Sequence, residues 1–429
     1  MKIFASVLLF YTFSANLLAF DLHSAVETAF KNDPQFISEE KVFEKQVELV
    51  NLARAPLLPN LSITSSYSDI TYSGNVDTKT QNIGLSLSQT LFDKTRFIVL
   101  DQSRLDVQIA ELNFELAQEK TILRITDAYF DILIAQNNLT SIKAEKNAVE
   151  EQLEFAKRNF EVGTSTITDQ QEAQARFDLI RASEIRTENA LAIARTNLTK
   201  SLLIPIPETF KGIKGKIIIE KPKYSAPSEW MKIARSKNLQ VKIASKKSQR
   251  SRLELKKKKA ERLPTLNLTL STGHSKQESL STLSQDNQII TLNVAAPIFL
   301  GGSISASKRQ AIADNEREKK NLELALLNAD RVAGKSFRTL VAGVSQVEAL
   351  EAAEASSKVA LESNKLGYEV GVRINIDVLN AQRQLFSTQR DLAIARYDVL
   401  KSKLQLLSAT GSLNINEVKK ISNLMLRNN

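Results

Sequence analysis

The sequence of 429 residues contains no cysteine, which excludes disulfide frameworks, thiolate metal sites and cysteine nucleophiles. It has two histidines, His23 and His274, too few to favour a histidine-based metal site or triad. Glycine (13) and proline (9) are scarce, although a nucleotide-binding domain or an all-β sandwich needs more turn residues. No nucleophile and base stand at a useful spacing. We therefore expect no enzyme, no catalytic residue, no metal and no cofactor.

Long apolar runs are also missing, except at the very start of the chain. Lys2 precedes an apolar run over 3–13, and small residues follow up to Ala19. This pattern is typical of a secretory signal peptide, here 1–19, with cleavage after Ala19 or Ala15; a buried N-terminal helix is the alternative. No later run reaches about 18 apolar residues, so we expect no transmembrane helix in the mature chain. An exported chain of this kind is soluble or forms a β-barrel.

The chain contains an internal repeat with an offset of about 205–208 residues. Residues 29–35 resemble 234–240, and 58–64 resemble 263–269. Further along, Phe160-Glu161-Val162-Gly163 answers Tyr368-Glu369-Val370-Gly371, and Asp169 answers Asp377. Such self-similarity indicates a duplicated supersecondary unit rather than one compact domain.

Each unit is predicted to hold helices, a strand pair, a very long helix, a tight turn and a further helix. The first unit, 20–204, has a helix over 33–57, strands over 60–90 with a loop at 71–80, a long helix over 94–160, a turn at 161–168 and a helix over 168–203. The second unit, 227–412, has strands over 264–296, a long helix over 303–369, a turn at 370–375 and a helix over 375–411. The segments 205–226 and 413–429 lie outside the repeat and are expected to form a belt around the helices.

Two periodicities support these elements. Leu61, Ile63 and Tyr67 alternate with polar residues, which is the period-two pattern of a strand with one apolar face. Between Lys94 and Phe160 there is neither proline nor glycine, and apolar residues recur at coiled-coil spacing. We expect the two shorter helices of the unit to stack end to end beside this long one.

Four amphipathic strands per chain cannot close a barrel, and an open sheet edge is not tolerated in lipid. Membrane barrels begin at about eight strands, so a dimer with eight or a trimer with twelve strands is needed. The low aromatic content of 6% fits a barrel that occupies only a small part of the chain. The sequence therefore predicts a composite barrel that carries long coiled-coil helices.

Several motifs resemble a known family. They are Ala55-Pro56-Leu57-Leu58-Pro59 before a strand, Ala128-Tyr129-Phe130-Asp131 in the long helix, the Phe160–Gly163 motif, Gly367-Tyr368-Glu369-Val370-Gly371, and Asp377-Val378-Leu379. In this order and spacing, over about 21–412, the chain resembles the TolC family of outer-membrane export channels.

The resemblance implies an α+β, mostly α, fold in the cell outer membrane with a large periplasmic part. A homotrimer would form a twelve-stranded transmembrane barrel, continued by an α-helical coiled-coil barrel. The implied function is the exit duct of a tripartite efflux pump or a type I secretion system. Its implied partners are a periplasmic adaptor protein, an inner-membrane transporter of the ABC or RND type, and outer-membrane lipid.

The resemblance also assigns candidate residues at the periplasmic end. The implied gate residues are Tyr368, Arg373, Asp169 and Gln152, which would hold the end closed through hydrogen bonds and ion pairs. Asp377 matches a carboxylate that rings the narrow entrance, and Asn380 stands where some members carry a second acid, so strong cation block is not expected. Adaptor contact is implied for the turns Val162-Gly163-Thr164 and Val370-Gly371-Val372. For the gate residues the alternative is that they are ordinary solvated residues of the tip. For the turns it is a helix hairpin that needs glycine at positive φ, which is compatible with adaptor contact.

The densest basic stretch ends in Lys256–Lys259, within a chain of formal net charge +10. Nucleic-acid binding is not expected, because the chain is predicted to be exported and no aromatic residues stand nearby for stacking. The stretch is either a solvated helix face or a contact with anionic headgroups of the inner leaflet of the outer membrane. His274 is predicted to be exposed and inert in a surface loop. A soluble periplasmic coiled-coil adaptor or chaperone is the alternative function, although it does not explain the strands.

Overall fold

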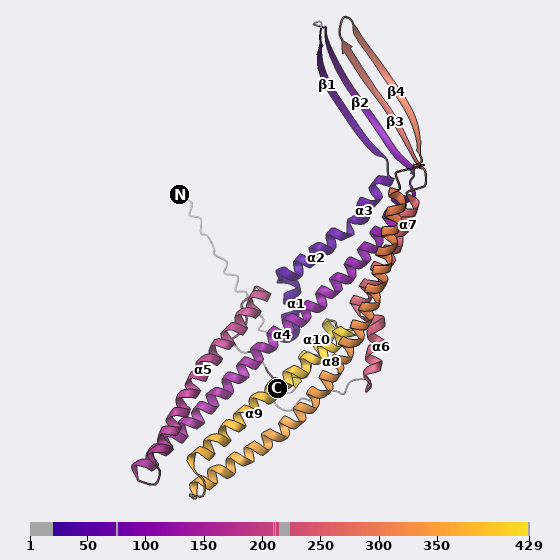
Figure 1. Cartoon of the computed structure of the whole chain (residues 1–429). Coiled ribbons are helices and arrows are strands. Elements are labelled where there is room, and N and C mark those ends of the chain that lie inside the picture. The colour runs from indigo at the N-terminus through magenta and orange to yellow at the C-terminus, as the bar shows by residue number, and fades with distance from the viewer. Residues whose placement is uncertain (1–19, 74–75, 209, 211, 214–223, 428–429) are drawn as a thin grey trace, which may run out of the picture.

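The computed structural model describes residues 20–73, 76–208, 210, 212–213 and 224–427. The predicted signal peptide, 1–19, lies outside the described residues, as does most of 214–226. The described chain is long and thin, with a sheet at one end and two helical hairpins at the other (Figure 1).

The first unit begins with short helices, continues into two strands and ends in two long helices. Its elements are α1 (Leu22–Asn32), α2 (Pro34–Val47), α3 (Leu49–Arg54), the short 3₁₀ helix η1 (Ala55–Leu57), β1 (Asn60–Tyr72), β2 (Val76–Phe92), α4 (Lys94–Glu161) and α5 (Ile167–Leu202).

The second unit repeats this order. Its elements are α6 (Pro227–Lys237), α7 (Leu239–Ala260), β3 (Thr265–Glu278), β4 (Thr282–Ala295), α8 (Ser303–Glu369) and α9 (Asn375–Ala409). A last helix, α10 (Ile415–Arg427), follows. The predicted duplicated unit, mostly helical with four strands, is confirmed.

Three details of the prediction are wrong. The helix expected over 33–57 is interrupted at Glu48, where α2 ends and α3 begins, and only the 3₁₀ turn η1 covers 55–57. The loop expected at 71–80 is much shorter, because β2 already starts at Val76 and its polar residues pair with β1. His274 lies in β3 rather than in a loop; it is exposed, but its ring contacts Asp286 and Ser284.

The four strands form one antiparallel sheet in the order β1-β2-β3-β4. The register places Leu87 beside Leu270, and Leu270 beside Ile290, so apolar residues of neighbouring strands share one face. These residues include exposed ones such as Ile290, which is 75% exposed. The outer strands β1 and β4 are both edges of the sheet, and each leaves a row of backbone groups without a strand partner.

The helices form a curved layer in which shorter helices flank the two long ones. Along α4, α2 and α3 occupy the half nearer the sheet and α5 the other half; α7 and α9 divide α8 in the same way (Figure 1). The joints are held by matching contacts: the side chain of Asn32 donates to the carbonyl of Leu202 at 3.2 Å, and that of Asn238 donates to the carbonyl of Ala409 at 2.9 Å. The expected end-to-end stacking is therefore present in both units.

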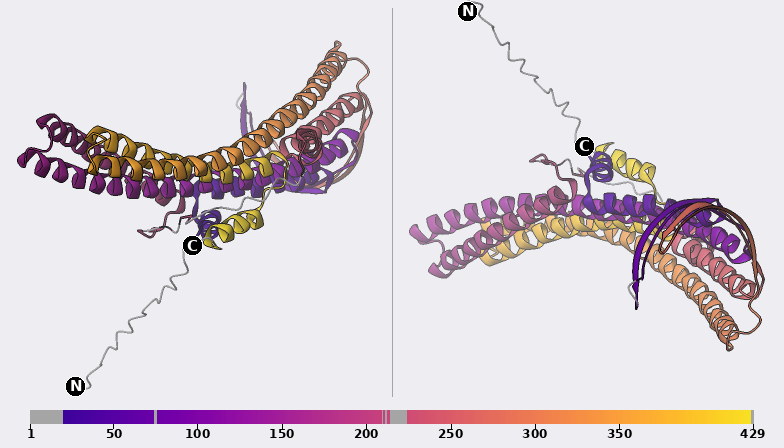
Figure 2. Two further views of the ribbon diagram at one scale, coloured as in Figure 1. Left: turned by 90° about the horizontal axis from the view of Figure 1, so that it is seen from below. Right: turned by 90° about the horizontal axis from the view of Figure 1, so that it is seen from above.

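The largest core lies near the middle of the layer, where α4 and α9 meet. Tyr129, Phe130 and Tyr397 are almost fully buried there, and the rings of Phe130 and Tyr397 lie 5.4 Å apart. Helices α1 and α10 cover this core from the convex side of the layer (Figure 2). In the part of the chain that the structure describes, no helix is both long and apolar enough to span a membrane.

Candidate functional site at the helical tip

The end of the layer farthest from the sheet, here called the tip, consists of two tight turns (Figure 1). Gly163 between α4 and α5 has φ 77°, and Gly371 between α8 and α9 has φ 75°, values that glycine adopts without strain. Each turn is closed by backbone bonds, such as that from Val372 N to the carbonyl of Gly367 at 2.8 Å. These bonds satisfy the carbonyl groups that a helix end leaves open.

The predicted adaptor-contact residues all lie in these turns, and their valines are exposed. Val162 is 73%, Val370 66% and Val372 79% exposed. Thr164 faces back toward its own helix, because its hydroxyl donates to the carbonyl of Asn159 at 3.1 Å. The tip therefore ends in apolar side chains that the described residues leave uncovered.

The carboxylate of Asp169 accepts hydrogen bonds from residues of its own turn. Thr166 caps α5, and Asp169 completes a capping box with it. Partial burial disfavours the charge of Asp169, but hydrogen bonds from Ser165 and Thr166 outweigh this, so the pKa of its carboxyl is lowered. Within the chain, the carboxylate of Asp169 is thus bound locally.

Arg373 lies in the other turn and pairs with Asp377, its Nη1 standing 3.7 Å from Oδ2 of the acid. Both side chains are partly exposed, at 58% and 35%, so this pair is weak. Helix α9 begins after Ile374, which offers no side-chain cap. Asn380 lies one turn beyond Asp377 and is exposed.

Tyr368 stands at the end of α8 and packs across the two hairpins. Its ring lies edge-on to Phe155 of α4 with centroids 5.7 Å apart. Its hydroxyl is buried and, among the described residues, has no hydrogen-bond partner. A buried hydroxyl without a partner is costly, so this contact does not hold the hairpins together strongly.

Asn375, which the sequence analysis missed, joins the two hairpins through hydrogen bonds. Gln152 of α4 donates to Oδ1 of Asn375 at 2.5 Å, and Nδ2 of Asn375 donates to the backbone carbonyl of Asp169 at 3.2 Å. Asn375 is fully buried, at 0% exposure. We call this arrangement of Gln152, Asn375 and the Asp169 carbonyl the tip clasp. It connects α4, α5 and α9 at one point.

A second junction lies two helical turns from Gln152 on the same face of α4. The buried carboxylate of Glu145 lies 2.9 Å from Nη1 of Arg390 in α9 and 3.5 Å from Nη2 of Arg176 in α5. Burial and repulsion from Arg383 and Arg390 lower the pKa of Arg176 against the attraction of Glu145. The sequence analysis also missed this junction, because its three residues are far apart in the chain.

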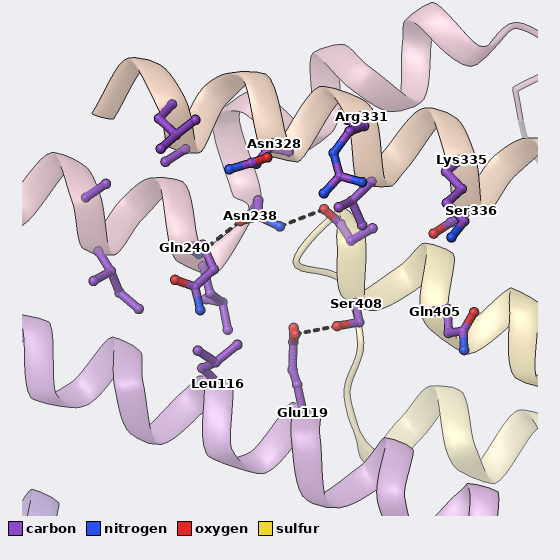
Figure 3. Close-up of a pocket in the computed structure, with 18 of the residues that line it drawn as sticks. Leu116, Glu119, Asn238, Gln240, Asn328, Arg331, Lys335, Ser336, Gln405 and Ser408 are labelled. Carbon is purple, nitrogen blue, oxygen red and sulfur yellow. Dashed lines mark hydrogen bonds between the residues drawn. The ribbon is translucent and has the colours of Figure 1, made fainter. Parts of the chain in front are cut away.

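A cavity of about 1080 Å³ lies far from the tip, between α4, α7, α8 and α9 (Figure 3). The carboxylate of Glu119 projects into it and accepts a hydrogen bond from Ser408 at 2.8 Å. Burial raises the pKa of Glu119 to about 7. No gate residue predicted from the sequence lines this cavity. The described residues contain no group of three or more histidine, cysteine or acidic side chains that could hold a metal ion.

Comparison with known proteins gives one consistent result. Residues 25–202 and 230–412 match the model of a family described as "Outer membrane efflux protein". The chain is 29% identical to "Outer membrane protein TolC" of Vibrio cholerae, over 96% of this chain and 95% of that protein. It is 27% identical to "Alkaline protease secretion protein AprF" of Pseudomonas aeruginosa, over 92% and 85%. The solved outer membrane protein VceC of Vibrio cholerae has the same fold, with a TM-score of 0.78 at 16% identity, over 91% and 96%.

Proposed function

Because the chain belongs to the outer membrane efflux protein family, we propose that it is a passive exit duct of a tripartite efflux pump or a type I secretion system. The duct has no catalytic role of its own. It lies in the outer membrane, and its long helices extend into the periplasm. The family match favours this channel function over the alternative of a soluble periplasmic adaptor or chaperone.

The duct is a homotrimer. Support comes from the sheet, because the outer sides of its edge strands β1 and β4 have no strand partner among the described residues. Since lipid supplies no hydrogen bonds, both edges need a partner strand. Pairing of β4 with β1 of the next copy closes the sheet, and three copies supply the twelve strands expected from the resemblance.

The helices supply a second argument for the trimer. Large apolar side chains are exposed on α5, at one side of the layer, and on α8, at the other. They are Leu179, Ile185 and Ile193 on α5, and Val341, Val359 and Leu366 on α8. Closing the sheet into a ring brings these two sides toward each other in neighbouring copies, so both stripes become covered.

The tip is the gate, and the tip clasp holds it in the state described. The observation that carries this proposal is the complete burial of Asn375 between α4, α5 and α9. Opening separates the α8/α9 hairpin from the α4/α5 hairpin, so both hydrogen bonds of Asn375 must break. Arg373 and Tyr368 contribute less, since the ion pair of Arg373 is exposed and the hydroxyl of Tyr368 is unpaired.

Asp377 supplies the charge at the entrance. Three copies around one axis form a ring of carboxylates that attracts cations. Asn380, one turn farther, adds no charge to this ring, so the entrance binds cations less strongly than a double ring would.

The exposed valines of the two turns are the docking surface for a periplasmic adaptor. Val162, Val370 and Val372 offer apolar contacts at the outermost part of the tip. An inner-membrane transporter of the ABC or RND type, joined through this adaptor, supplies the energy. The relatives include one named for the secretion of a protease and the family is named for efflux, so both kinds of cargo are consistent with the chain.

The test is the molar mass of the mature protein extracted from membranes, measured by light scattering with the detergent mass subtracted. Three chains per particle, with ion conductance after insertion into a planar lipid bilayer, are the expected results. A monomer in the soluble fraction would refute the duct and favour the periplasmic coiled-coil alternative.

A further inference from the structure

The basic end of α7 is only partly neutralised by the chain itself. Lys257 pairs with Glu254 at 2.7 Å, and Lys258 pairs with Glu261 at 2.7 Å. Lys256 and Lys259 are exposed. In the part of the chain that the structure describes, neither of them lies within ion-pair distance of a carboxylate. Two of the four lysines are therefore free to meet an external anion.

The free lysines belong to one stripe of α7. Arg252, Lys256 and Lys259 are spaced three and four residues apart, so they share a helix face, and all three are exposed. Ser245 lies two helical turns before Arg252 and therefore on the same face of α7. It lines a small pocket together with Arg235 of α6. The stripe therefore continues the side of α7 on which α6 lies.

That side is the convex outer one. In the second unit α6 takes the place that α1 takes in the first, since each precedes the medium helix and packs on the long helix of its unit. Helix α1 lies on the convex side of the layer, next to α10 (Figure 2). Because α6 corresponds to α1 in the repeat, the stripe lies on the convex side of the layer and faces away from the concave side.

The stripe ends where the apolar surface of the sheet begins. Helix α7 ends at Ala260, and β3 starts at Thr265. Leu263 between them is 44% exposed, and Val294, which pairs with the second residue of β3, is 64% exposed. Arg262 adds one more exposed charge at this junction. A membrane that covers the apolar sheet therefore places its headgroups at the level of these side chains.

We propose that Arg252, Lys256, Lys259 and Arg262, here called the basic collar, bind anionic phospholipid headgroups of the leaflet that faces the periplasm. Long basic side chains bury their apolar stems near the membrane and place the charge among the phosphates. Each basic residue near an anionic surface strengthens binding about fivefold. This attraction falls off within about 8 Å at physiological salt, so only residues close to the junction contribute.

The test uses the full chain in nanodiscs of phosphatidylcholine with a minor share of phosphatidylglycerol. The phosphatidylglycerol that stays bound to each particle is counted by native mass spectrometry. The test variant is Lys256→Gln with Lys259→Gln. The matched control is Lys246→Gln with Lys247→Gln, which removes the same charge from the same helix about 15 Å farther from the junction.

We expect the wild type to enrich phosphatidylglycerol, the test variant to lose about 25-fold in its affinity, and the control to change less than about twofold. A variant with Lys256→Arg and Lys259→Arg keeps the enrichment, and added salt removes it from the wild type. The proposal is overturned if the test variant binds as the wild type does, or if the control loses as much. Only variants whose melting temperature equals that of the wild type are compared. If a variant does not fold, the salt series on the wild type is the test, and the proposal is overturned if added salt leaves the enrichment of phosphatidylglycerol unchanged.

Discussion

Replacing Asn375 with alanine tests the tip clasp directly. The side chain of Asn375 makes two hydrogen bonds, to Gln152 at 2.5 Å and to the carbonyl of Asp169 at 3.2 Å. Alanine removes both and leaves the amide of Gln152 without its partner. If these bonds exist only while the hairpins lie together, Asn375→Ala favours the open tip.

The size of the effect follows from the number of bonds. A typical intramolecular hydrogen bond contributes about 1 kcal/mol net, so losing two weakens the clasp by about 2 kcal/mol per chain. This raises the ratio of open to closed tip about 30-fold. Gln152→Ala removes one of the two bonds, so we expect about fivefold for that variant.

The assay is single-channel conductance in planar lipid bilayers, with the open fraction recorded for each variant. Asn364→Ala is the control, because Asn364 lies near the end of α8 and its side chain bonds a carbonyl of its own helix, that of Ala360. We expect the open fraction to rise in the order Asn364→Ala, Gln152→Ala, Asn375→Ala, with the first equal to the wild type.

Two results would refute the reasoning. The clasp is not the gate if Asn375→Ala opens no more often than Asn364→Ala while its melting temperature falls, because the bonds then stabilise only the fold. The effect does not follow the number of hydrogen bonds lost if Gln152→Ala opens more often than Asn375→Ala. Losing the one bond of Gln152 would then have a larger effect than losing both bonds of Asn375.

Three further predictions concern buried or converging charges. Glu145→Gln leaves Arg390 without its counter-charge and destabilises the chain by about 3 kcal/mol, seen as a lower melting temperature; the double variant Glu145→Leu with Arg390→Met recovers part of the loss. The pKa of Glu119 is raised from 4.5 to about 7, so its contribution to stability is complete below about pH 4.5 and is lost as the pH rises through about 7. Glu119→Gln is therefore more stable than the wild type at about pH 8, by about 3 kcal/mol in the free energy of unfolding, and this advantage disappears at about pH 4. The measurement is thermal unfolding of both proteins at the two pH values, and equal melting temperatures at both contradict the prediction. Asp377→Asn lowers the preference of the open channel for cations over anions, measured as a shift in reversal potential across a salt gradient, and an unchanged potential excludes a charged ring at the entrance.

The fold could be predicted from the sequence because its periodicities are long and repeated. The alternation around Leu61 and Ile63 identifies a strand, and the same pattern returns one unit later. The break at Glu48 could not be predicted, since neither proline nor glycine marks it. The short hairpin loop was also missed, because polar residues such as Thr80 pair in the strand as Ser68 does opposite it.

The site was only partly predictable, and the cause is long-range contact. Gln152 was identified from the resemblance, but its partner Asn375 lies 223 residues away in the chain. Glu145 and Arg390 are 245 residues apart. An isolated acid within a helix rich in charge gives no local signal that it will be buried. Only the packing of α9 against α4 reveals either contact.

The repeat does contain one clue to the clasp. At the start of α5 the capping residue is Thr166, and Asp169 completes the capping box. At the matching start of α9 the capping position holds Ile374, whose side chain cannot accept a hydrogen bond, and Asn375 follows one position later. A polar side chain that does not cap its own helix is free to bond a neighbouring one, and Asn375 does so with α4 and α5. The two units thus share a backbone but differ at Asn375, and this difference supplies one of the contacts that join the two hairpins.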